Sequence, residues 1–189
     1  MSSLGNLTVL TGPSGVGKGT IVRKILESHI DVWLSISATT RQPRAGELHG
    51  EHYLFLEKKE FQKIIDKEGF LEWASFSKNF YGTPKKIVKE KIKKGINVLL
   101  EIELEGARQI RKSFPEGLQI FLSPPNLAEL EKRIRGRGTE TEKAIRDRLA
   151  IANKEIMAKK EFDAVVINED IEKAFMEIEG LMGLKLQPN

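Results

Sequence analysis

A glycine-rich segment near the amino terminus constrains the fold and the ligand of this chain more than any other feature. The segment GPSGVGKGT, from Gly12 to Thr20, follows the apolar run Leu7–Leu10 and precedes apolar residues at helical spacing. A strand, a glycine-rich bend and a helix in this order form a loop whose backbone N–H groups, together with the positive end of the helix dipole, face phosphates. The sequence therefore predicts a site for a nucleoside triphosphate.

Individual residues of this loop have separate expected roles. Lys18 adds a mobile positive charge for the outer phosphates, and the position after it is Gly19 instead of the usual Ser or Thr, so that the hydroxyl comes at Thr20. We therefore expect Thr20 to contact phosphate and no side chain here to ligate Mg²⁺ directly. The alternative is a plain glycine-rich turn with a solvated Lys18. The predicted triphosphate-binding residues of the loop are Gly12, Pro13, Ser14, Gly15, Val16, Gly17, Lys18, Gly19 and Thr20.

Composition excludes several other kinds of chemistry. The chain has no cysteine, which excludes disulfides, thiolate metal sites and thiol catalysis. Its histidines, His29, His49 and His52, lack metal-ligand spacing and are expected at the surface or in loops. The net charge of +4 is spread among 27 acidic residues, which favours an anionic small ligand over nucleic acid. No apolar run approaches the ~20 residues of a membrane span and no signal peptide is evident, so we expect a soluble, cytoplasmic protein without a membrane partner.

Near-continuous apolar runs alternate with helical patterns along the chain. The runs lie at residues 7–10, 98–102, 118–122 and 164–167, and the helical patterns at about 18–28, 84–94, 105–113, 126–135, 141–160 and 170–182. Strands that are apolar on both sides are typical of a parallel sheet covered on both faces. The pattern predicts an α/β fold with a central parallel sheet and a ligand at the carboxyl ends of its strands.

Two regions interrupt this alternation. Residues 35–83 combine alternating strand character with a short helix around Phe61–Asp66, which predicts an inserted lobe. Residues 135–142 are polar, carry arginines and glycines, and lie between two helical patterns, which predicts a mobile flap.

The inserted lobe carries the other candidate site residues. Arg41 and Arg44 flank Pro43, and such guanidinium forks suit the terminal oxygens of a phosphate. Glu72 lies in the run FLEW, where a carboxylate has apolar neighbours. The alternative is an acid at a strand or helix edge that faces water.

Taken in order, these motifs resemble those of guanylate kinases, P-loop enzymes that phosphorylate GMP. The motifs are SATTRQPRAGE, GEHYLF, FLEW, YGTP, GRGTETE and VVINEDIEKA, and the resemblance runs from about Leu7 to Ala174. It implies a P-loop NTPase-type three-layer fold with a single domain: a core (1–34, 84–134 and 150–189), a GMP-binding lobe (about 35–83) and a mobile lid (about 135–149). It also implies transfer of a phosphoryl group from ATP to GMP, or to dGMP, with Mg²⁺, in purine nucleotide metabolism.

The resemblance assigns the acceptor site residue by residue. Glu72 matches the carboxylate that accepts hydrogen bonds from the N1–H and the 2-amino group of guanine, and Ser37 and Thr83 match positions near the base. Adenine has the reverse polarity, and an unsatisfied buried polar group costs about 1–3 kcal/mol, so AMP is expected to bind poorly. The residues assigned to the GMP phosphate are Arg41, Arg44, Tyr53 and Tyr81.

Catalysis is expected to rest on positioning and on neutralising charge, as is usual for phosphoryl transfer. The resemblance assigns this work to Lys18, Arg41, Arg133, Arg137 and Arg148. For the last three, the alternative is a set of helix-surface cations paired with Glu140 or Glu142. Asn168 matches a position beside the adenine, although an Asn after a strand is also common in turns. No general base is expected, because a phosphate monoester with a second pKa ~6 is largely ionised at pH 7.

One segment departs from the family pattern. Guanylate kinases carry a sequence similar to Asp-Ile-Asp-x-Gln-Gly where this chain has Glu101, Glu103 and Glu105 before Gly106. Glu101 is expected to hold Mg²⁺ through water, Glu103 matches a position near guanine, and Glu105 is explained by the positive end of a helix dipole.

Two other functions stay open from the sequence. One is a non-catalytic interaction module, because guanylate-kinase-like domains also serve as scaffolds, although those typically lose the phosphate loop. The other is a related P-loop kinase with a different small acceptor, which is expected to lack the set Ser37, Glu72 and Thr83.

Overall fold

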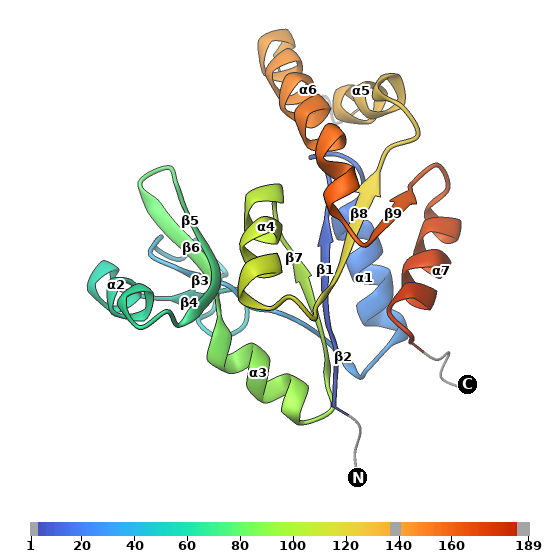
Figure 1. Ribbon diagram of the computed structural model, residues 1–189. Helices are drawn as coiled ribbons and strands as arrows, with labels where there is room; N and C mark the ends of the chain where they lie inside the picture. Colours follow the sequence, from blue (N-terminus) through green and yellow to red (C-terminus); the bar gives the residue numbers. More distant parts are fainter. Residues whose placement is uncertain (1–3, 137–140, 185–189) are drawn as a thin grey trace.

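A five-stranded parallel sheet forms the centre of the computed structural model, which describes residues 4–136 and 141–184 (Figure 1). Its strands run in the order β2-β7-β1-β8-β9. Their bounds are β1 (Leu7–Thr11), β2 (Val32–Leu34), β7 (Asn97–Glu101), β8 (Leu118–Ser123) and β9 (Ala164–Ile167). In the centre, Thr8 of β1 lies opposite Leu99 of β7 and Leu118 of β8. The predicted parallel sheet is confirmed, and the short edge strand β2 is an addition to it.

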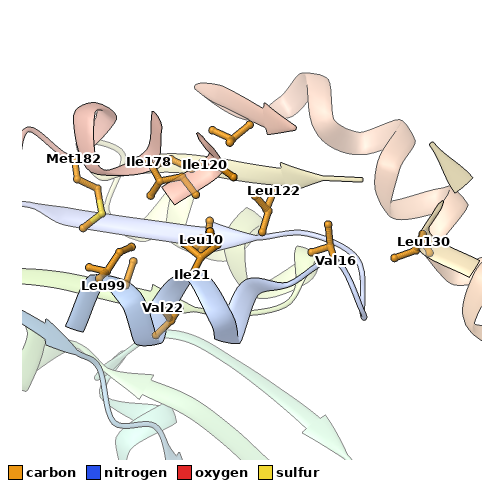
Figure 2. Packing of buried hydrophobic residues seen from close by; sticks show 14 of the residues in the cluster. Leu10, Val16, Ile21, Val22, Leu99, Ile120, Leu122, Leu130, Ile178 and Met182 are labelled. Carbon is orange, nitrogen blue, oxygen red and sulfur yellow. The ribbon is translucent and has the colours of Figure 1, made fainter. Parts of the chain in front are cut away.

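Helices cover both faces of this sheet, which gives three layers. One face carries α1 (Lys18–Ser28) and α7 (Ile171–Leu181), and the other carries α3 (Lys85–Lys93) and α4 (Leu104–Ser113). Between β8 and β9 the chain forms α5 (Leu127–Arg135), α6 (Glu142–Met157) and the 3₁₀ turn η1 (Ala158–Glu161), and Figure 1 shows α5 and much of α6 beyond the carboxyl ends of the strands. One core joins Leu10 of β1 to α1 and α7, as Figure 2 shows, and another joins Leu7 and Val9 to α3 and α4. Successive residues of β1 thus point into opposite cores, which explains its continuous apolar sequence.

A smaller, four-stranded sheet lies beside the first, on the side of α4 (Figure 1). Its order is β4-β3-β6-β5, with bounds β3 (Ala38–Thr39), β4 (Leu54–Phe55), β5 (Phe70–Phe76) and β6 (Asn79–Pro84), and it carries α2 (Lys58–Asp66). A separate small core forms around Ala38, Phe61 and Phe70. This unit coincides with the region expected to be an inserted lobe. That this unit is a GMP-binding lobe within a single domain stays a proposal.

His29 contradicts the expectation of surface histidines. Its side chain is 1% exposed, and Nε2 lies 2.5 Å from Oε1 of Glu179. The histidine ends α1, and the glutamate comes from α7, so the pair joins the two helices on one face of the sheet. His49 and His52 are exposed, as predicted.

The predicted flap falls between α5 and α6, and its residues 137–140 lie outside the described part of the chain. On either side of that gap, Arg135 of α5 pairs with Glu142 of α6 and with Glu131 one turn earlier. Across residues 4–136 and 141–184, no helix combines the length and the apolar character needed to cross a membrane.

Candidate active site

The glycine-rich loop wraps around the side chain of Lys18. Nζ of Lys18 donates to the carbonyl oxygen of Gly12 at 2.5 Å, and it lies 3.4 Å from that of Pro13. The loop borders a cavity of about 390 Å³. The cavity is lined by Pro13, Ser14, Gly15, Gly17, Lys18, Gly19, Thr20, Arg23, Glu101 and Glu103. Helix α1 begins at Lys18, so its unpaired N-terminal N–H groups and the Lys18 charge lie at an anion site.

Two glycines of the loop have no room for a side chain. A Cβ at Gly12 would lie 2.2 Å from the carbonyl oxygen of Leu122, and one at Gly17 would lie 2.6 Å from Nδ2 of Asn168. Both residues also have positive φ, 150° and 108°, which side-chain-bearing residues rarely adopt. The close packing of the loop on β8 and on the end of β9 therefore requires these glycines.

Side chains from the carboxyl half of the chain hold the loop in place. Nδ2 of Asn168 donates to the carbonyl oxygen of Val16 at 2.7 Å, and Nη2 of Arg133 donates to the carbonyl oxygen of Asn168 at 2.9 Å. Nη2 of Arg148 donates to Oγ of Ser14 at 2.5 Å. Asn168 is 3% exposed and lies under the loop, where its amide binds protein backbone. Arg137 lies outside the described residues.

A second, larger cavity of about 610 Å³ opens between the two sheets. It is lined by Ser37, Tyr53, Glu72, Ala74, Ser75, Phe76, Tyr81, Glu101, Ile102, Glu103, Glu105 and Gly106. Glu101 and Glu103 line both cavities, so the two adjoin at the carboxyl end of β7. Of the predicted acceptor residues, Ser37, Tyr53, Glu72, Tyr81 and Glu103 line this second cavity. Arg41, Arg44 and Thr83 are not among its lining residues.

Glu72 is the buried carboxylate of the second cavity. Glu72 is 8% exposed, and its Oε1 accepts a hydrogen bond from Oγ1 of Thr83 at 2.7 Å. Burial raises the pKa of the Glu72 carboxyl, and the hydrogen bonds from Thr83 oppose that rise only in part. The interpretation of Glu72 as an acid facing water is therefore wrong. Buried and only partly hydrogen-bonded, this carboxylate can accept two adjacent donors.

Tyr53 and Tyr81 also line this cavity, and Arg41 lies against Tyr53. The guanidinium of Arg41 lies 5.2 Å from the ring centroid of Tyr53, and the rings of Tyr53 and Tyr81 are 6.3 Å apart. Glu47 accepts from both terminal nitrogens of Arg41, at 2.8 and 2.9 Å, and from the backbone N–H of Arg44 at 2.7 Å. These bonds, with Arg41 as the main cause, lower the pKa of Glu47 to about 2. The side chain of Arg44 is exposed.

Sequence reasoning missed Glu47 and Glu155. Glu47 closes the motif TRQPRAGE and was identifiable as an acid beside two arginines. Glu155 of α6 has a raised pKa because of burial and of Glu103, with Lys18 acting in the opposite direction. Nothing in the sequence near Glu155 indicates this proximity.

Glu101 ends β7 beside the glycine-rich loop. Burial raises the pKa of its carboxyl, Lys18 opposes the rise and Glu103 adds to it. Its Oε1 would lie 3.9 Å from a Cβ on Gly19, at the position where a hydroxyl is missing. In the described part of the chain, no three His, Cys, Asp or Glu side chains are arranged to hold a metal ion.

Known proteins share both the sequence and the fold of this chain. The model of the guanylate kinase family matches residues 5–184. A guanylate kinase of Prochlorococcus marinus (strain NATL2A) is 87% identical over 98% of this chain and 100% of its own length. Another, from Synechococcus sp. (strain CC9311), is 58% identical over 97% of this chain and 97% of its own.

Solved structures agree with these sequence relatives. The crystal structure of guanylate kinase from Anaplasma phagocytophilum has a TM-score of 0.72 and 31% identity, and the match covers 100% of this chain and 89% of that one. Shikimate kinase from Bacteroides thetaiotaomicron has a TM-score of 0.50 and 13% identity, over 95% of this chain and 99% of that one, which shows a shared fold alone.

Proposed function

The chain belongs to the guanylate kinase family and catalyses the ATP-dependent phosphorylation of GMP to GDP, and on this premise we propose how its residues divide the two substrates. The cavity at the glycine-rich loop takes ATP, and the cavity between the sheets takes GMP. The observation that carries this division is that the two cavities adjoin at Glu101 and Glu103. Reacting groups held in adjoining cavities meet without diffusing through solvent.

GMP recognition uses both ends of the second cavity. The guanine N1–H and 2-amino group donate to Glu72, and Ser37, Thr83 and Glu103 lie around the base. At the other end, the phosphate binds Arg41, Arg44, Tyr53 and Tyr81. The burial of Glu72 supports this proposal, because a buried carboxylate gains most from a ligand that supplies two donors. These contacts involve the base and the phosphate only, so dGMP fits the same proposal.

ATP binding rests on the loop residues from Gly12 to Thr20. Lys18 and the N–H groups at the start of α1 face the phosphates. Asn168 and Arg133 also support this loop, because Asn168 donates to the carbonyl oxygen of Val16 and Arg133 donates to that of Asn168. The expected place of Asn168 beside the adenine stays a prediction.

In the transfer step, an oxygen of the GMP phosphate attacks the γ-phosphorus of ATP. The bond from the γ-phosphorus to the bridging oxygen breaks, and ADP leaves with that electron pair. Lys18, Arg41, Arg133, Arg137 and Arg148 neutralise the charge shared among these oxygens. Closure of residues 135–149 excludes water that would otherwise hydrolyse ATP.

Mg²⁺ fits the acidic end of β7. Glu101 is a hard oxygen ligand beside the loop, and Mg²⁺ commonly keeps several waters and binds one or two carboxylates plus substrate phosphates. Glu101 would hold it through water, and the ion would supply charge neutralisation to the ATP phosphates. Gly19 offers no hydroxyl to it.

Initial-rate kinetics with both substrates varied test this division. Asn168→Ala removes the support of Val16 and should raise the KM for ATP by about tenfold, with the KM for GMP changed less than about twofold. Tyr81→Phe removes a hydroxyl from the GMP cavity and should raise the KM for GMP while leaving the KM for ATP nearly unchanged. If each variant raises both KM values equally, the assignment of separate donor and acceptor cavities is wrong.

A further inference from the structure

Side chains of helix α4 form hydrogen bonds with the backbone of β5 on both sides of Glu72. The backbone N–H of Trp73 donates to Oε1 of Gln109, and Nε2 of Gln109 donates back to the carbonyl oxygen of Trp73, both at 3.0 Å. Oγ of Ser113 donates to the carbonyl oxygen of Leu71 at 2.6 Å. The residue between Leu71 and Trp73 is Glu72, so the two helix side chains bracket the buried carboxylate.

These contacts replace a missing strand. Among the strands of the described residues, β5 lies at the edge of the smaller sheet with β6 on one side only, so its outward N–H and C=O groups have no strand partner there. The side-chain amide of Gln109 offers one acceptor and one donor, which is what a residue of a neighbouring strand would offer. The edge of β5 at Trp73 is thereby fixed to α4, which covers the central sheet. Figure 1 shows α4 between β5 and the central sheet.

The strand is irregular at this point. Its register against β6 shifts between Phe70 and Glu72, which is the position of Leu71. A bulge of this kind redirects a neighbouring side chain and leaves a backbone group without its ladder partner. Ser113 takes up the carbonyl of Leu71, so α4 stabilises the irregularity that precedes Glu72.

The same helix also limits where the carboxylate can lie. A Cβ at Gly106 of α4 would lie 3.1 Å from Oε2 of Glu72. Positions 106, 109 and 113 are three and four residues apart and therefore share one face of the helix. One face of α4 thus contacts Leu71, Glu72 and Trp73 in turn.

We infer that Gln109 and Ser113 are positioning residues that set the place of Glu72 for guanine recognition. The inference rests on the proposed role of Glu72 toward guanine. It adds that selectivity depends on side chains that touch neither substrate, because they hold the backbone from which Glu72 projects.

Steady-state kinetics on Gln109→Met and Ser113→Ala test the inference. Met keeps the length of the Gln side chain and removes both hydrogen bonds to Trp73. Each variant should raise the KM for GMP, by about tenfold for Gln109→Met and about threefold for Ser113→Ala, with the KM for ATP changed less than about twofold. Ser113→Thr keeps the hydroxyl and should restore the KM. Ser113→Ala removes a single atom, so it keeps the test valid if Gln109→Met folds poorly.

Gln119→Met is the matched control. Its side chain is 1% exposed and donates to the carbonyl oxygen of Ala107, also on α4 but on the side of β8. Its loss should lower the melting temperature and leave the KM for GMP within about twofold. If Gln119→Met raises the KM for GMP as much as Gln109→Met does, general loosening of α4 explains the effect and the inference is overturned.

A double-mutant cycle with Glu72→Gln separates this inference from the proposed function. If Gln109 acts through Glu72, Gln109→Met should change the KM for GMP less than about twofold in the Glu72→Gln background. An undiminished effect in that background overturns the inference. If Glu72→Gln alone leaves the KM for GMP unchanged, the proposed role of Glu72 fails instead.

Discussion

Glu47 and Arg41 form a bidentate ion pair in the segment between β3 and β4. Oε2 and Oε1 of Glu47 accept from Nη1 and Nη2 of Arg41 at 2.8 and 2.9 Å. The same carboxylate accepts from the backbone N–H of Arg44 at 2.7 Å. One acid thus fixes the side chain of Arg41 and the backbone at Arg44, and two parallel bonds fix the orientation of the Arg41 guanidinium plane.

Glu47→Ala should therefore weaken GMP binding. Without the carboxylate, the guanidinium of Arg41 loses its fixed orientation, and the KM for GMP should rise by about tenfold while the KM for ATP stays within about twofold. The control is Glu51→Ala, an exposed acid of the same lobe. An unchanged KM for GMP in Glu47→Ala would exclude Glu47 from the acceptor site.

Gly106→Ala should separate activity from stability. An Ala inside a helix is favoured over Gly by about 1 kcal/mol, so the melting temperature should hold or rise. The new methyl, however, would lie 3.1 Å from Oε2 of Glu72, and the KM for GMP should rise. Gly180→Ala in α7 is the control, because no described residue has an atom within 4 Å of its Cβ position, and it should raise the melting temperature alone. A Gly106→Ala enzyme with normal GMP kinetics would contradict the proposed crowding.

The raised pKa of Glu72 predicts two pH effects. Only the ionised carboxylate accepts both guanine donors, so kcat/KM for GMP should rise with pH through that pKa, and this limb should be missing from Glu72→Gln. The limb that comes from the GMP phosphate, pKa ~6, should persist in both enzymes.

The stability of the folded protein should fall with rising pH over the range in which kcat/KM for GMP rises. A carboxyl with a raised pKa in the folded state binds its proton more tightly there than in the unfolded chain. Stability is therefore lost as pH rises from the unfolded pKa through the folded one. In thermal melts, the melting temperature of Glu72→Gln should rise relative to that of the unmodified protein as the pH increases across that interval. Parallel curves for the two proteins at all pH values would contradict the burial of this charge.

The pair of His29 and Glu179 should contribute to stability and not to catalysis. Glu179→Leu leaves Nε2 of the buried His29 without its partner, while Nδ1 has no hydrogen-bond partner within residues 4–136 and 141–184. The free energy of unfolding should therefore fall by about 1–3 kcal/mol. Urea denaturation at pH 7 measures this, with the exposed Glu177→Ala in the same helix as control. Equal stability of the two variants would show that the pair is energetically neutral.

Secondary structure was largely predictable from local sequence. The runs around Leu10, Leu99, Ile120 and Val166 are apolar on both sides because each strand packs against helices on both faces. The edge strand β2 has only three residues, too few for a pattern. The buried place of His29 depends on Glu179, 150 residues away, and no local signal reports such a partner.

Some residues of the candidate site are likewise indicated by local sequence, and others are revealed only by packing. Motif residues such as Lys18 and Glu72 were identifiable because glycine-rich loops and carboxylates in apolar surroundings have direct chemical meanings. Gln109, Ser113 and Glu155 were not, since their relevance comes from the packing of α4 and α6 against other elements. Glu103 lines both cavities, which its sequence position alone did not indicate.

Acceptor selectivity measures the central claim most directly. A coupled assay of ADP formation should compare kcat/KM for GMP and for AMP in the unmodified enzyme and in Glu72→Gln. A site built to satisfy two donors rejects an analogue that lacks them by about 10⁴, so GMP should be preferred by that order, and Glu72→Gln should lose most of the preference. Equal kcat/KM for GMP and AMP in the unmodified enzyme, or an unchanged ratio in Glu72→Gln, would contradict recognition of guanine by this buried carboxylate.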